Sequence, residues 1–69
     1  MQQGIIRRYF DDRGYGFLQP DSGGSDLFFH VRAFTVLVEP KENQRVEYDV
    51  AIDRNGREQA KNLRLMLND

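Results

Sequence analysis

Short apolar runs separated by closely spaced turn residues are the feature that most restricts how this chain can fold. Each run has the length of a strand, and clusters of Gly, Pro, Asn and Asp at this spacing are typical of small all-β barrels and sandwiches. The Asn55-Gly56 pair is the clearest turn, because both residues tolerate the positive φ of a tight hairpin. The pattern predicts five strands, at residues 4–10, 15–19, 26–31, 44–53 and 58–66.

The length of 69 residues leaves room for one hydrophobic core, so we expect a single domain over residues 1–69. Five strands with a longer connection between the third and the fourth fit an all-β, five-stranded antiparallel Greek-key barrel, the OB-fold. An SH3-like barrel is the structural alternative. The connection at residues 32–43 fits a helical turn, a short strand or a loop under the barrel, and we expect Val36, Leu37 and Val38 to be buried there.

Aromatic side chains recur at alternate positions in the second and third predicted strands. Side chains alternate between the two faces of a strand, so Tyr15 and Phe17 share one face, as do Phe28 and His30. If Leu18, Leu27 and Phe29 fill the core, these four side chains point outward. We call the four the ring platform, because exposed rings on adjacent strands can stack unpaired bases. The glycines on either side of Tyr15 are expected to leave room for a flat ligand.

Composition narrows the functions that remain. The net charge of −1 argues against a binder that relies on phosphate neutralisation, but eight of the ten basic residues are Arg, which stacks on bases as well as binding phosphates. The absence of Cys and of any apolar run of about 20 residues favours a cytoplasmic protein without a membrane span. His30 is the only histidine and has no nucleophile or metal-ligand pattern around it, so we expect no enzyme activity, no metal and no cofactor.

Two motifs resemble those of the cold-shock domain family. Residues 13–18, Arg-Gly-Tyr-Gly-Phe-Leu, resemble the first ribonucleoprotein motif, which is usually Lys/Arg-Gly-aromatic-Gly-Phe-Ile. Residues 27–31, Leu-Phe-Phe-His-Val, resemble the second, which is usually Val-Phe-Val-His-Phe. With the Asn-Gly turn and residues 59–63, which resemble the closing hairpin and last strand, the resemblance extends from Gly4 to about Leu63. It implies a barrel that binds single-stranded RNA or DNA with little sequence preference, in a role like that of an RNA chaperone.

The resemblance also implies which side chains meet the nucleic acid. The ring platform would stack bases, Arg13 would contact the backbone or stack at the edge of the strand, and Asp26 would hydrogen-bond a base edge. Gln59 lies where the family often has a polar contact, and Lys61 would follow the phosphates. The candidate binding residues are Arg8, Tyr9, Arg13, Tyr15, Phe17, Asp26, Phe28, His30, Gln59 and Lys61.

The chain departs from the family pattern in the first strand, where cold-shock proteins usually have Lys-Trp-Phe-Asn. In a gapless comparison Arg8 stands at the Trp position and Phe10 at the Asn position, and Tyr9 is the nearest remaining ring. Arg8 can still stack on a base through its guanidinium plane. Val31 replaces a phenylalanine that often follows the second motif, and the connection lacks a Gly-Phe-Lys-Thr-Leu-like segment. We therefore expect weaker binding than in a typical member.

A second hypothesis is a barrel whose ring-bearing face binds a protein partner, with vestigial affinity for nucleic acid. The near-neutral charge and the missing tryptophan favour it. Exposed rings could also pair two barrels, so weak self-association is a further expectation. We expect no small-molecule substrate.

Overall fold

Each of the five predicted strands forms, and each strand end lies within two residues of its predicted position. The computed structural model describes residues 1–66; residues 67–69, the last three of the predicted domain, lie outside the described residues. The strands are β1 (Gln2–Phe10), β2 (Tyr15–Pro20), β3 (Leu27–His30), β4 (Arg45–Ile52) and β5 (Glu58–Leu65).

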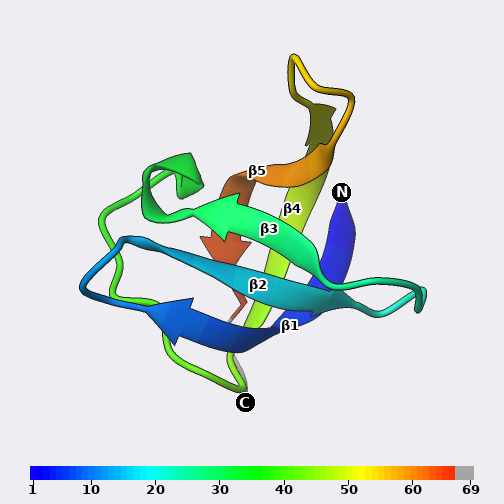
Figure 1. Cartoon of the computed structure of the whole chain (residues 1–69). Helices are drawn as coiled ribbons and strands as arrows, with labels where there is room; N and C mark the ends of the chain where they lie inside the picture. The colour runs from blue at the N-terminus through cyan, green and yellow to red at the C-terminus, as the bar shows by residue number, and fades with distance from the viewer. Residues whose placement is uncertain (67–69) are drawn as a thin grey trace.

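The strands close into a barrel in the order β1-β2-β3-β5-β4, with β4 next to β1 (Figure 1). β1, β2 and β3 follow one another as antiparallel neighbours, and β4 and β5 form an antiparallel hairpin. Because the chain between β3 and β4 runs along one end of the barrel, β5 and not β4 lies beside β3, through a parallel bridge between Phe28 and Gln59. The predicted OB-type Greek-key barrel is confirmed, with one parallel pairing where the sequence predicts only antiparallel ones.

β1 contains a β-bulge that changes which side chains face outward. Ile6 pairs with Leu18 and Arg8 pairs with Phe17, so Arg7 is an extra residue in β1. A bulge sets two residues of one strand against one residue of its partner and bends the bulged strand. Beyond Arg7 the alternation of faces is therefore shifted by one residue.

A second irregularity lies in β5. The pairing of β4 with β5 moves from Glu47 with Arg64 to Asp49 with Lys61, so β5 has one more residue than β4 in this interval. Asn62 within it has a φ of 52°, in the left-handed region, and its side-chain amide donates a 3.2 Å hydrogen bond to Asp49. Asn tolerates this backbone conformation better than most residues, which accounts for its presence at the irregularity.

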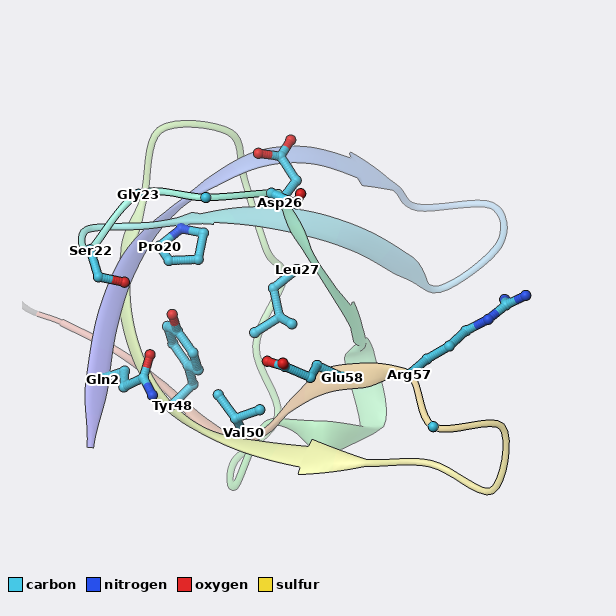
Figure 2. A pocket seen from close by; sticks show the side chains of 13 residues that line it. Gln2, Pro20, Ser22, Gly23, Asp26, Leu27, Tyr48, Val50, Arg57 and Glu58 are labelled. Atoms are coloured by element: carbon cyan, nitrogen blue, oxygen red, sulfur yellow. The ribbon is translucent and has the colours of Figure 1, made fainter.

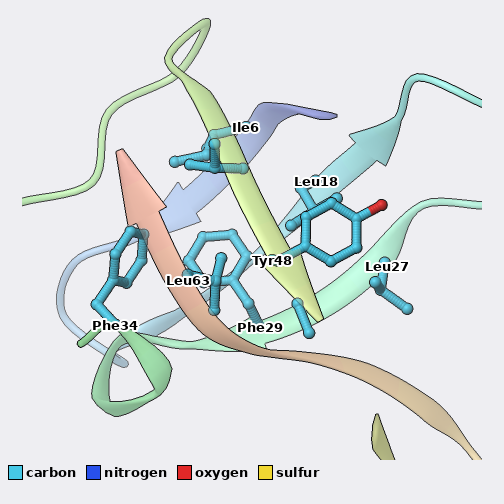
Figure 3. Packing of buried hydrophobic residues seen from close by; sticks show 9 residues of the cluster. Ile6, Leu18, Leu27, Phe29, Phe34, Tyr48 and Leu63 are labelled. Atoms are coloured by element: carbon cyan, nitrogen blue, oxygen red, sulfur yellow. The ribbon is translucent and has the colours of Figure 1, made fainter. Parts of the chain in front are cut away.

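The inward faces of the strands form one hydrophobic core (Figure 3). The side chains predicted to point inward from β2 and β3 are buried: Leu18 and Phe29 are fully buried, and Leu27 is nearly so. The prediction that the faces alternate in these two strands is thereby confirmed. The remaining buried hydrophobic residues are Ile6, Phe34, Val46, Tyr48, Ala60 and Leu63.

The connection after β3 begins with a 3₁₀ turn, Val31–Ala33, and then places Phe34 in the core beside Leu63. Of the three apolar residues expected to be buried in this segment, only Val38 packs against the core. The expectation is wrong for Val36 and Leu37, whose exposed fractions are 63% and 104%. Phe34 therefore takes the core position at this end of the barrel, and the chain bulges outward at Val36 and Leu37 before Val38 returns to the core.

An ion pair fastens the β2–β3 loop to the barrel. Arg45 on β4 donates hydrogen bonds to the carboxylate of Asp21 and to the side chain of Gln3 on β1. The hydrogen bonds that the Arg45 guanidinium donates to Asp21 raise its pKa above the ordinary value. Within residues 1–66, no helix has the length and apolar character needed to cross a membrane.

Candidate nucleic-acid interface

The structure brings the four side chains of the ring platform together on the outer face of β2 and β3. In the β2–β3 ladder Tyr15 lies opposite His30, and Phe17 lies opposite Phe28. Ring centroids are 5.6 Å apart between Tyr15 and Phe28 and 6.0 Å apart between Phe17 and Phe28. The three aromatic rings are half-buried and His30 is exposed, so the platform forms a continuous surface that a flat ligand can reach.

The rings of the platform are set at angles to one another. The plane of Phe17 makes angles of 89° with Tyr15 and 73° with Phe28, whereas Tyr15 and Phe28 are inclined by 35°. Edge-to-face contacts of this kind are favourable, because the positive edge of one ring meets the negative face of the next. The rings therefore hold one another in place and turn their faces in different directions.

The imidazole of His30 is fixed by the backbone that follows it. Its Nδ1 accepts a 3.1 Å hydrogen bond from the N–H of Arg32 and so caps the 3₁₀ turn. A nitrogen that accepts a hydrogen bond carries no proton, so the neutral ring has its proton on Nε2. The turn thus orients the ring and leaves one N–H donor for a ligand.

β1 adds two side chains to this face, as a consequence of its bulge. Arg8 lies opposite Phe17 and Phe10 lies opposite Tyr15. The ring of Phe10 is half-buried, and its centroid is 5.4 Å from that of Tyr15. Sequence reasoning missed Phe10 as a candidate, although strand alternation from Arg8 was a signal that could have found it.

Tyr9 is not part of this surface, which corrects the sequence prediction. Its ring lies nearly parallel to Phe29, with centroids 6.1 Å apart and an angle of 8° between the planes, and it packs against the core. Neighbouring residues of a strand face opposite sides, so Arg8 and Tyr9 cannot both point outward once Arg8 is opposite Phe17.

The glycine after Tyr15 has a different role from the expected one. Gly16 is buried, and a Cβ placed on it would lie 2.9 Å from the Phe29 ring, 3.0 Å from the Cα of Tyr9 and in contact with the carbonyl oxygen of Arg8. Such distances are too short for ordinary packing. Gly16 therefore lets β1 approach β2 above Phe29, and the expectation that it makes room for a ligand is wrong.

Two hollows flank the ring platform, and Gln59 borders both because it lies beside Phe28. One of about 460 Å³ extends from Phe17 and Phe28 toward the β4–β5 hairpin, and one of about 420 Å³ lies beside His30. Sequence reasoning missed two cations in these hollows, Arg57 and Arg32. The first hollow is also lined by Asp26, Asp53, Arg57 and Glu58, and the second by Arg32, Ala33, Ala60 and Lys61.

Charges are distributed unevenly around the platform. The hollow beside His30 holds the cations Arg32 and Lys61, whereas the hollow beside Phe17 holds three carboxylates and one Arg. The candidate Asp26 lies in the acidic hollow, and the candidate Arg13 is exposed in the turn that leads into β2. The Tyr15–His30 end of the platform is therefore the more positive end, and the Phe17–Phe28 end is the more negative one.

A third cavity, of about 570 Å³, opens at one end of the barrel and lies away from the rings (Figure 2). Leu27, Tyr48 and Val50 point into it from the strands, and Arg57 points away from it. The hydroxyl of Tyr48 is buried there without a hydrogen-bond partner in the described structure. Burial, and secondly the negative charge of Asp21, raises the pKa of Tyr48 above its ordinary value.

Among residues 1–66, no group of three or more His, Cys, Asp or Glu side chains is placed to hold a metal ion.

Comparisons with known proteins agree with this geometry. The family described as 'Cold-shock' DNA-binding domain matches residues 2–66. The chain is 36% identical over 66 residues to a probable cold shock protein of Sinorhizobium fredii, y4cH, covering 91% of this chain and 96% of the relative. It is 36% identical over 67 residues to the cold shock protein CspA of Rhizobium meliloti, covering 93% and 97%, and 34% identical over 58 residues to the cold shock-like protein CspG of Escherichia coli, covering 77% and 79%.

Proposed function

This chain belongs to the 'Cold-shock' DNA-binding domain family, and from that premise we propose that it binds unpaired RNA or DNA by stacking bases on the ring platform. The observation that carries the proposal is a group of contacting rings on the outer face of β2 and β3. None of these rings belongs to the buried core, which has aromatic residues of its own. An exposed aromatic surface on so small a protein is typical of a binding site. Stacking on it would be tolerant of sequence, because every base has a π-face.

Cations have a secondary part in the proposal. Arg8 stands opposite Phe17, and Lys61 lines the hollow beside His30, where it would meet phosphates. Arg13 is exposed in the turn before Tyr15 and would contact the backbone of the bound strand. The net charge of −1 and the carboxylates near Phe17 limit the electrostatic attraction. Affinity should therefore depend only weakly on salt, with a slope of about −0.7 per phosphate contacted.

Holding strands unpaired is the role that such a surface suits best. Stacked bases are unavailable for pairing, so a protein that binds them weakly and with little sequence preference would keep RNA open, in the manner of an RNA chaperone. We place this activity in the cytoplasm, which the cysteine-free composition favours. Asp26 and Gln59 would add hydrogen bonds to base edges near Phe28.

Titration of labelled oligo-dT and oligo-U, at low and at physiological salt, tests the proposal. Phe17→Ala and Phe28→Ala should each weaken binding by about 1–3 kcal/mol while the barrel stays folded. Ile52→Ala is the matched control, because Ile52 is an apolar side chain that is 70% exposed and lies outside the platform. Absence of binding at roughly 100 µM protein, or ring variants that bind as well as the parent, would refute the proposal. Capture of a protein through the same face, without oligonucleotide binding, would support the partner-binding alternative.

A further inference from the structure

Phe10 is an aromatic side chain held firmly at the edge of the ring platform. Its carbonyl oxygen accepts hydrogen bonds from the backbone N–H groups of Arg13, at 3.0 Å, and Gly14, at 2.8 Å, which close the β1–β2 turn. Its ring touches Tyr15 at a centroid distance of 5.4 Å and an angle of 51°. The ring is half-buried and continues the outward face of β2 across to β1.

The core does not account for Phe10. The buried cluster and the partly buried side chains packed against it, as the described residues define them, include Tyr9 and omit Phe10. The contact that Phe10 makes is with Tyr15, a member of the outer surface. In this part of β1 it is the neighbouring residue, Tyr9, that packs its ring against the core, on Phe29.

We propose that Phe10 forms an additional stacking subsite for a terminal unpaired base, one step beyond Tyr15. This inference rests on the proposed function and extends it by naming where the bound strand continues. The path runs from Phe28 and Phe17 to Tyr15 and then to Phe10, each ring within 6.4 Å of the next.

Charge contributes little to this subsite. Arg13 lies in the β1–β2 turn next to Phe10, but Asp11 and Asp12 occupy the same turn, and all three side chains are exposed. The two carboxylates offset the attraction that the guanidinium has for phosphate. Stacking must therefore carry the subsite, and its share of the affinity should not change with salt concentration.

Oligo-dT of increasing length, about four to eight nucleotides, is the probe for this subsite. In the parent, affinity should rise as the strand becomes long enough to reach Phe10. Phe10→Ala should abolish the increase in affinity between the shorter and the longest oligonucleotides. Its affinity for the longest one should fall roughly 5- to 150-fold, which corresponds to about 1–3 kcal/mol for one stacked base. The shortest oligonucleotides should bind the variant as they bind the parent, and the slope against salt should be unchanged.

Phe10→Leu separates stacking from simple apolar contact and protects the test against unfolding of the alanine variant. Leucine keeps an apolar contact with Tyr15 but has no π-face, so it should lose nearly as much affinity as alanine. If either variant binds the longest strand like the parent while Phe17→Ala is weakened, the subsite is disproved and the proposed function stands. If the parent binds no oligonucleotide of any length, both proposals fall together.

Discussion

The ring of Tyr9 lies parallel to the ring of Phe29, with centroids 6.1 Å apart, and forms a lid over the core on the β1 side of the barrel. Phe29 itself is fully buried and also touches Phe34 edge-to-face, so the half-buried Tyr9 joins a cluster of three contacting rings. Tyr9 is thus a stabilising residue, and substitutions at this position should affect folding.

Tyr9→Ala should lower the free energy of unfolding by about 2–3 kcal/mol, because it removes apolar burial and an aromatic pair together. Chemical denaturation measures the loss. Tyr9→Phe, which keeps the ring over Phe29, is the control and should change stability little. A folded Tyr9→Ala protein that retains its stability but loses oligonucleotide binding would contradict the assignment of this ring to the core.

Gly16→Ala should be among the most damaging small substitutions in the chain. The new methyl group would contact backbone atoms of β1 and the Phe29 ring, neither of which can move freely, so we expect a loss of at least about 3 kcal/mol. Gly56→Ala is the comparison: Gly56 has a φ of 78° but no atom within 4 Å of an added Cβ. Its cost is conformational alone, about 1–2 kcal/mol. Denaturation midpoints that rank the two variants in the opposite order would refute the steric argument.

Tyr48→Phe should stabilise the barrel. The substitution removes a buried hydroxyl that has no hydrogen-bond partner and leaves the ring in place, so a gain of about 1 kcal/mol is expected near neutral pH.

The stability that Tyr48→Phe gains over the parent should increase above pH 10. The pKa of Tyr48 is raised in the folded protein, so as pH rises past the ordinary tyrosine value of about 10 the unfolded chain loses this proton first. Stability of the parent therefore falls with pH in that range, whereas phenylalanine has no proton to lose. The free energy of unfolding of parent and variant, measured from pH 7 to about pH 11, tests this pH dependence. A difference in free energy that stays constant across this range would contradict it.

The segment after the 3₁₀ turn should respond very differently at two nearby positions. Phe34→Ala, which empties a buried site next to Leu63, should cost about 3–5 kcal/mol. Leu37→Ser should change stability by no more than about 0.5 kcal/mol, because the side chain is fully exposed. Thermal and chemical unfolding of both variants decide the point, and a large loss for Leu37→Ser would mean that this residue packs against the barrel after all.

The strands, their approximate ends and the outward rings of β2 and β3 could be predicted from the sequence. Turn residues bracket each strand, and between Tyr15 and Leu18, and between Leu27 and His30, the pairing is regular, so simple alternation sorts inward from outward side chains. The same reasoning failed for the connection after β3. An apolar run there is compatible with burial, but in this segment Phe34 and Val38 pack into the core while Val36 and Leu37 between them face outward.

What the sequence alone determined is the barrel and the ring-bearing face of two regular strands, because both follow from local turn chemistry and from alternation within a strand. What only the tertiary structure decided is which aromatic side chain of β1, Tyr9 or Phe10, lies with Arg8 on that face. The extra residue Arg7 shifts the alternation, so that Arg8 and Phe10 lie beside the ring platform while Tyr9 turns inward over Phe29. Alternation counted from the buried Ile6 would place Tyr9 outward and Phe10 inward. The bulge reverses this order, and it depends on pairing with β2 and on packing against Phe29, 20 positions away in the chain.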